Sequence, residues 1–326
     1  MRGARSVVVV ALAASLLAAC DIPRPPLGSG GGGSGGSTPA AASAPKIGGC
    51  QVFPSSNAWN QNVSKLAVRS DSATLVRRIS ATGGHTMLHP DFGGAGQYGI
   101  PFKVVSASQP RLPIHYTAYG NESDPGPFPI PSNAPVEGGS SSTGDRHVLV
   151  VQQSTCHLFE LYDAHWRGNR WDAASGANWN LATNKLRPLG WTSADAAGLP
   201  ILPGLVRYDE VHSGAINHAL RFTVAETQRG YILPATHDAS SSTDATLPAM
   251  GLRLRLDANY SLSRFHGQAL VILRALKQYG MIVADNGGSW FITGAADPRW
   301  NDDDLNQLKT VPGSAFQAVN TGPIHH

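Results

Sequence analysis

Acidic side chains and histidines gather in four short segments of this chain. They are residues 88–93, 144–147, 207–218 and 234–238. Most of these segments lie at the ends of predicted strands, where side chains far apart in sequence can converge on one cleft. General acid–base catalysis needs two such groups with differently tuned pKa values. The residue types therefore indicate an enzyme that moves protons.

Hydrolysis of a glycosidic bond needs two carboxyl groups that flank the bond. The best-placed candidates are Glu160, Asp163, Asp209 and Glu210. Asp209 and Glu210 are adjacent, so in an extended strand they would point to opposite faces and only one would serve. The expected catalytic set adds two histidines and consists of Asp209, Glu210, His147, Glu160 and His237.

A polyuronate lyase is the alternative enzyme. It needs an arginine or amide to neutralise the sugar carboxylate, and a histidine or tyrosine to remove the C5 proton. Residues that could meet this need are Arg221, Arg253 and Arg255 with His147, His218 or Tyr208.

Substrate binding by either enzyme would draw on cations, polar groups and exposed aromatic rings. The predicted substrate-binding residues are Arg207, Arg221, Trp191, Asp91 and His89. Sugar platforms could also form on Trp166, Trp171 and Trp179, although burial is the commoner fate of tryptophan.

A metal site is a further alternative. His89, Asp91, His147 and His237 are suitable ligand types, but no short spacing joins them as a set. No metal ligand is therefore assigned and no cofactor is expected, with structural calcium or zinc left as alternatives.

Several known catalytic signatures are missing from the folded region. It has no G-x-S-x-G elbow, no H-E-x-x-H, no Walker loop and no G-x-G-x-x-G before a predicted helix. These absences disfavour α/β-hydrolase esterases, helix-borne zinc peptidases and nucleotide-binding folds.

The candidate residues must be positioned by a scaffold of short strands. Glycine and proline are abundant, at 36 and 23 residues, and only 14% of residues are charged, which is typical of many turns. Predicted strands cover residues 102–105, 112–116, 147–151, 156–162, 219–224, 229–233, 252–256, 281–284 and 290–293.

Two details of these strands carry further expectations. Arg221, Arg253 and Arg255 alternate with apolar residues, which predicts a basic polar sheet face. The segment 285–288, Asp-Asn-Gly-Gly, suits a hairpin turn between the last two strands.

One long helix is expected over residues 264–279, and a shorter one begins at Asn301. Few helices and many short strands favour a mainly β fold, a β-sandwich or jelly roll with helical additions.

The N-terminus predicts export. Arg2 and Arg5 precede an apolar run too short for a comfortable membrane span, which is the layout of a secretory signal. Residues 17–20, Leu-Ala-Ala-Cys, resemble the lipobox of bacterial lipoproteins, in which the Cys20 thiol is acylated. The resemblance implies a lipid-anchored protein of the bacterial cell envelope, at the periplasmic or extracellular face. An ordinary cleaved signal is the alternative.

Residues 21–47 are rich in Gly, Ser, Pro and Ala and contain no aromatic residue. Such a stretch cannot bury apolar surface, so we expect a flexible linker that spans roughly 25–30 Å. Residues 48–326 then form one globular domain, because no second low-complexity break follows.

Cys50 and Cys156 are the cysteines that remain after Cys20. An even pair in an oxidising compartment predicts a disulfide, and two buried thiols are the alternative. A catalytic Cys156–His157 pair is disfavoured because neighbours on a strand point to opposite faces.

The formal net charge is only +3, and the basic residues are dispersed. This pattern lacks the footprint of a nucleic-acid-binding protein. The expected partners are the membrane, through the lipid, and a polysaccharide ligand.

Segments spread over nearly the whole domain resemble a family of uncharacterised secreted bacterial and fungal proteins. They include Leu-His-Pro-Asp-Phe-Gly at 88–93, Asp-Arg-His-Val-Leu-Val at 145–150 and the segment 190–210. The resemblance implies an extracytoplasmic globular unit and transfers no catalytic role.

The residues together favour an extracytoplasmic enzyme acting on a polysaccharide or cell-wall glycan, either a glycoside hydrolase or a polyuronate lyase. A non-catalytic lipoprotein that binds a glycan or a protein is the alternative, and a structural envelope protein is the third.

Overall fold

Apolar residues occupy every position from 148 to 151, and the surroundings of this strand explain why. In the computed structural model they belong to β6 (Val148–Gln152), which is buried along its whole length. Val148 and Val150 pack into one hydrophobic core, whereas Leu149 and Val151 pack into another. A strand covered on both faces needs apolar side chains at every position rather than at alternate ones.

The structure describes residues 44–326. The predicted signal sequence, the lipidation of Cys20 and residues 21–43 of the predicted linker lie outside the described residues. β1 (Lys46–Ile47) falls at the end of that linker, pairs with β2 (Cys50–Gln51) and buries Ile47. Within residues 44–326, no helix has both the length and the apolar character that a membrane span requires.

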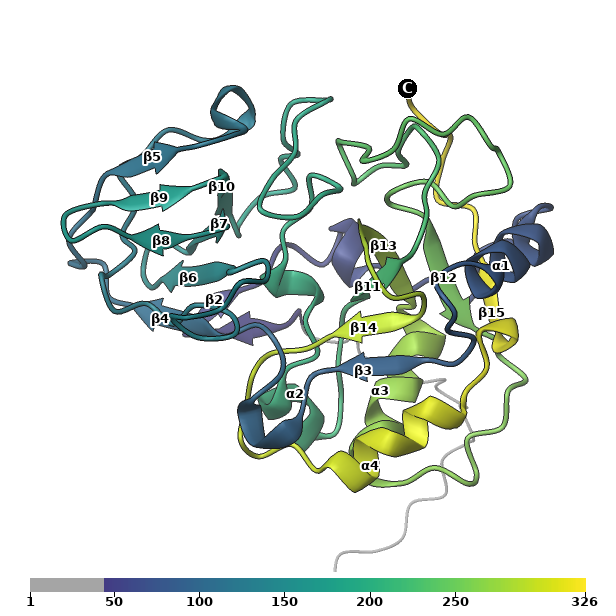
Figure 1. Cartoon of the computed structure of the whole chain (residues 1–326). Coiled ribbons are helices and arrows are strands. Elements are labelled where there is room, and N and C mark those ends of the chain that lie inside the picture. Colours follow the sequence, from purple (N-terminus) through teal and green to yellow (C-terminus); the bar gives the residue numbers. More distant parts are fainter. Residues whose placement is uncertain (1–43) are drawn as a thin grey trace, which may run out of the picture. The chain divides into compact units, whose positions relative to one another are not determined.

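β6 belongs to a four-stranded sheet of order β10-β7-β6-β4. The other members are β10 (Ser175–Asn180), β7 (His157–Tyr162) and β4 (Phe102–Val105). A three-stranded sheet lies beside it on the left of Figure 1 and consists of β5 (Ile114–Tyr116), β9 (Trp171–Ala173) and β8 (His165–Trp166). Trp171 joins Phe159 and Leu161 in the smaller core, so the two sheets share it.

A six-stranded mixed sheet has the order β15-β12-β13-β11-β14-β3. Its strands are β15 (Phe316–Ala318), β12 (Arg253–Leu256), β13 (Met281–Asn286), β11 (Leu220–Val224), β14 (Phe291–Thr293) and β3 (His89–Asp91). The predicted β-rich fold with some helices is confirmed.

Helix α3 (Gly267–Gln278) occupies the segment predicted as the long helix and buries the apolar stripe Ala269, Ile272, Leu273 and Leu276. α4 (Asp302–Asn306) begins after Asn301, whose side chain accepts hydrogen bonds from the Asp303 and Asp304 N–H groups. α1 (Ser72–Ala81) and α2 (Tyr208–Ser213) were not expected. Short 3-10 helices cover Ala58–Asn60, Gly94–Gly96, Gly120–Glu122, Leu202–Gly204, Gln307–Thr310 and Gly313–Ala315.

The predicted hairpin at residues 285–288 is wrong. β13 and β14 do not pair, because β11 lies between them, parallel to β13 and antiparallel to β14. The positive φ angle of this connection falls at Trp290, with φ 68°, rather than at either glycine.

The predicted strand at 229–233 is also absent. In this segment Tyr231 forms only isolated bridges, to Met250 and His325. Gly230 adopts φ 116°, which interrupts an extended backbone.

The predicted basic sheet face does not form, because Arg221, Arg253 and Arg255 are all buried. Arg253 donates to the carbonyls of Ala58, Gln61 and Tyr279, and Arg255 donates to that of Val63. Backbone acceptors thus bind both cations, although Arg255 Nε is buried without a partner in the described residues.

Cys50 and Cys156 form the predicted disulfide, with a Cα–Cα distance of 5.3 Å and a sequence separation of 106. It ties β2 to the turn before β7.

Replacing both cysteines by alanine should lower the free energy of unfolding by about 2–5 kcal/mol, because the cross-link restricts a long loop in the unfolded chain. Urea unfolding followed by tryptophan fluorescence measures this loss. Wild-type protein treated with a reductant is the control and should show a similar loss. An unchanged midpoint in both samples would contradict the prediction.

Candidate functional site

A cavity of about 290 Å³ opens where side chains from both large sheets meet two loops. Its lining consists of Tyr119, Asp145, His147, Tyr162, Ser175, Thr192, Ser193, Ala194, Asp195, Ala196, His237, Ala239, Asp285 and Asn286. We call it the Asp285 cavity. Its volume is near the lower end of small-molecule sites, which span roughly 300–1,000 Å³.

Arg221 on β11 organises one wall of this cavity from behind. Its Nε and Nη2 each donate to an oxygen of Asp195 at 2.8 Å, and Nη2 also donates to Asp285 at 3.1 Å. Nη1 donates to the Thr293 hydroxyl at 2.8 Å. The two carboxylates raise the pKa of Arg221 against the opposing effect of its burial, so the guanidinium stays charged.

Asp285 stands at the end of β13 with its side chain one quarter exposed, at 25%. Burial raises the pKa of Asp285 to about 6, although Arg221 and the Asn286 N–H favour the carboxylate. Asp195 contributes to the increase, because its negative charge shares the same arginine. Asp285 can therefore exchange a proton near neutral pH.

His147 directly precedes β6 and has both ring nitrogens engaged. Nδ1 lies 2.6 Å from Glu137 Oε2 and Nε2 lies 3.1 Å from the Ala194 carbonyl oxygen. Burial disfavours the imidazolium, but the hydrogen bond and charge of Glu137 outweigh it and raise the pKa of His147. Since both neighbours are acceptors, a doubly protonated ring satisfies the site, and His147 acts as a fixed positive group.

His237 offers a ring nitrogen toward the cavity. Its Nδ1 lies 2.8 Å from the Ala196 carbonyl oxygen, which can only accept, so the proton belongs on Nδ1. Nε2 lies 3.9 Å from Glu122 Oε2, beyond hydrogen-bond distance. In that tautomer Nε2 carries no hydrogen and can accept a hydrogen bond.

The 192–199 segment presents Asp195 because its backbone is held on several sides. Ser175 donates to the Ser193 carbonyl at 2.6 Å, and Ser193 donates to that of Leu199 at 2.6 Å. Gly198 adopts φ 68°, and a Cβ there would collide with the Trp191 carbonyl and the Thr236 hydroxyl. Glycine is required at this turn, which sets the path of the loop.

Asp209 and Glu210 lie on α2 and Arg207 directly precedes it, and none of the three lines the Asp285 cavity. Asp209 is 82% exposed and pairs with Arg299. Glu210 binds Arg207 and His218, whose charges outweigh its burial and lower the pKa of Glu210 to about 2. The prediction assumed an extended backbone, in which Asp209 and Glu210 would point to opposite faces. The two residues instead lie on a helix, where Asp209 is exposed and Glu210 contacts Arg207 and His218.

Glu160 is fully buried on β7 and does not line the Asp285 cavity. Its carboxylate accepts hydrogen bonds from the Ile201 and Leu202 N–H groups and from Trp179 Nε1. Burial raises the pKa of Glu160 to about 7 against these hydrogen bonds. Its contacts make it an anchor for the segment that leads to Arg207.

His89 and Asp91 line a different cavity, of about 330 Å³. Trp191 lines a groove of about 730 Å³. His89 stacks on Phe291 at 4.1 Å between ring centroids. Burial raises the pKa of Asp91, the charge of Glu137 raises it further, and the charge of Arg221 lowers it. Because Arg221 affects this pKa, Asp91 lies close enough to the Arg221 network to interact with it electrostatically.

Of the predicted tryptophan platforms, Trp171 and Trp179 are buried, whereas Trp166 and Trp191 are partly exposed. Across residues 44–326, no three His, Cys, Asp or Glu side chains are grouped so that they could hold a metal ion.

The structure thus brings His147 and His237 together and adds Arg221 behind them. The sequence reasoning missed Asp285 and Asp195. Asp285 was assigned to a turn, and Asp195 was given no role. The available signal was position: Asp285 lies near the end of a strand, and Asp145 lies just before one.

No protein-family model, curated protein or solved structure matches this chain.

Replacing Arg221 by methionine should lower the free energy of unfolding by about 3–5 kcal/mol, because Asp195 would stay buried without its cation. Arg299→Met is the matched control, since Arg299 pairs with acids at the surface and should matter little. Urea denaturation measures both variants. Equal losses would show that Arg221 contributes no more than a surface ion pair.

Proposed function

We propose that this protein is an extracytoplasmic, lipid-anchored enzyme that hydrolyses glycosidic bonds of a polysaccharide or cell-wall glycan in the Asp285 cavity. The observation that carries the proposal is the position of Asp285, a carboxyl on the cavity wall that Arg221 holds and whose pKa is raised to about 6. Such a group can donate its proton to the oxygen of the leaving sugar.

Asp145 supplies the second carboxyl group. It lines the same cavity, is exposed, and its side chain has no hydrogen bond or ion pair within residues 44–326. Burial raises the pKa of Tyr162 most, and the negative charges of Asp145 and Asp285 raise it further. Both carboxyl groups therefore act on the part of the cavity that Tyr162 lines. A carboxyl group in this position could activate a water molecule or attack the anomeric carbon.

Hydrolysis is better supported than the lyase reaction. A lyase needs a cation free to neutralise the uronate carboxylate, but Arg221 already donates to Asp195, Asp285 and Thr293. His147 is likewise occupied by Glu137.

The disulfide supports the extracytoplasmic location, because such bonds persist in oxidising compartments. Anchoring through Cys20 remains a prediction from the lipobox. Metabolic labelling with a fatty acid, compared between the wild type and Cys20→Ala, tests it.

Asp285→Asn should lower kcat by about 100-fold or more, because an amide of nearly the same shape cannot donate the catalytic proton. The release of reducing ends from a panel of bacterial and plant glycans measures the rate. Asp209→Asn is the control, since Asp209 is an exposed carboxylate outside the cavity. Full activity of Asp285→Asn, or no product from any glycan with the wild type, would refute the proposal.

The pH profile should report the same group. Asp285 must be protonated to act as the acid, so kcat/KM should decline as the pH rises through about 6. The initial rate on the best substrate, measured from pH 4 to pH 9, tests this. A rate that increases across pH 6 would exclude Asp285 as the acid.

A further inference from the structure

A second hollow lies beside the Asp285 cavity. It is a groove of about 730 Å³, with β10 on one side and the segment 183–191 on the other. We call it the Trp191 groove. Its volume exceeds that of the Asp285 cavity, so it can hold more than one sugar ring.

Two tryptophans and an arginine build its aromatic part. The Arg187 guanidinium carbon lies 5.6 Å from the ring centroid of Trp179 and 5.7 Å from that of Trp191. Trp179 is buried, whereas Trp191 is partly exposed. Trp191 is therefore an ordered ring that still has a solvent-facing surface, as stacking on a pyranose ring requires.

Arg187 is itself held rigidly. Its side chain is only 4% exposed and binds Asp124 at 2.6 Å. It also donates to the carbonyls of Thr192 and Glu122, each at 2.7 Å. The cation beneath Trp191 therefore cannot swing away, and the aromatic platform is preorganised.

The β10 side of the groove offers hydrogen-bond donors. Asn178 and Asn180 alternate with Trp179 on β10 and are both exposed. Their side-chain oxygens are occupied, by His157 Nδ1 at 2.7 Å and by the Ala182 N–H at 2.9 Å. Within the described residues their amide nitrogens have no partner, so they can donate to sugar hydroxyls.

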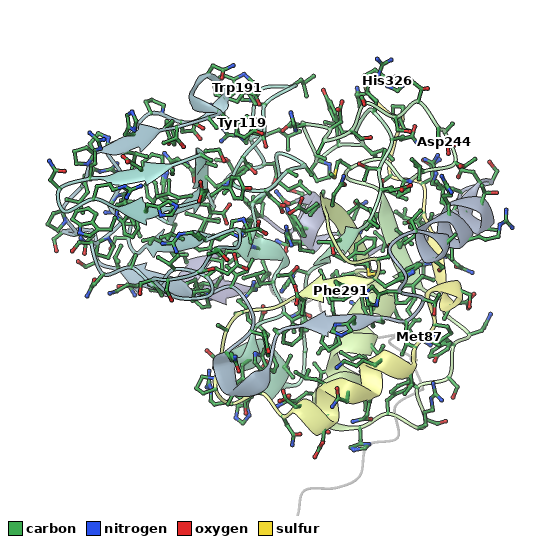
Figure 2. All side chains as sticks on the ribbon, viewed as in Figure 1. Met87, Tyr119, Trp191, Asp244, Phe291 and His326 are labelled. Carbon is green, nitrogen blue, oxygen red and sulfur yellow. A yellow bond between two sulfur atoms is a disulfide. The ribbon has the colours of Figure 1, made fainter. Side chains whose placement is uncertain are left out.

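The groove and the Asp285 cavity share a boundary at Trp191 and Thr192, since Trp191 lines one and Thr192 the other. Glu122 ties this boundary to the loop that carries Tyr119, because its carboxylate accepts from the Thr192 N–H at 3.0 Å. In Figure 2, Tyr119 and Trp191 lie near one another at the upper edge of the structure. The two hollows are therefore adjacent, with Trp191 and Thr192 between them.

We propose that the Trp191 groove is an additional carbohydrate subsite, which binds the flanking pyranose units of a glycan whose scissile bond lies in the Asp285 cavity. This inference rests on the proposed function and adds to it that the substrate is a polymer rather than a small glycoside.

The test is the dependence of affinity on glycan length. Full-length protein carrying Asp285→Asn, so that the probe is not consumed, is applied to an array of oligosaccharides of two to eight pyranose units. Affinities for the best series are then measured by isothermal titration. The hexasaccharide should bind at least about tenfold more tightly than the disaccharide, which corresponds to about 1.4 kcal/mol.

Adding Trp191→Ala should abolish this length advantage and leave disaccharide binding unchanged. Asn180 lies on β10, on the other side of the groove from Trp191. Asn180→Ala should therefore also reduce the length advantage, and this second variant keeps the test decisive if Trp191→Ala folds poorly. Leu189→Ala is the matched control, because Leu189 is 61% exposed in the same segment and does not line the groove.

Equal affinities for short and long probes, an unchanged length advantage in both groove variants, or no binding on the array would overturn the inference. Length-dependent binding without turnover by the wild type would instead overturn the proposed hydrolysis and leave the subsite standing.

Discussion

The buried guanidinium of Arg221 is the interaction on which the candidate site depends. It joins β11 to Asp195 in the 192–199 segment, to Asp285 at the end of β13 and to Thr293 at the end of β14. Removing a cation from water is costly unless acceptors surround it, and here two carboxylates and a hydroxyl do so. The same contacts orient Asp285 toward the cavity, so stability and chemistry share one network.

A second buried ion supports the opposite side of the site. Glu160 on β7 holds the Ile201 and Leu202 N–H groups and the Trp179 indole. Trp179 in turn packs on Arg187, which also packs on Trp191. A carboxylate in the core therefore connects the four-stranded sheet to the loop that separates the cavity from the groove. This arrangement explains why a proline-rich irregular segment can present side chains in fixed positions.

The proposed chemistry comes from two acids in contrasting surroundings. Asp285 is largely buried beside a second carboxylate that shares its arginine, which favours its protonated form. Asp145 lines the same cavity, is exposed and has no ion pair within the described residues. His147, although it lines the cavity, is bound to Glu137 and contributes a fixed charge rather than a mobile proton. Such a contrast between neighbouring groups separates an acid from a base.

Local patterns in the sequence were enough to predict the β-rich class, helix α3, the start of α4 and the Cys50–Cys156 pair. Periodicity, acidic residues in the first helical turn and cysteine count act over short distances or by elimination. His147, His237 and Arg221 were recognised by residue type. Asp285 was not, because its role depends on β11 lying between β13 and β14, a pairing that no local signal encodes. Which charges are buried, and which of them meet, was decided only when strands distant in sequence packed together.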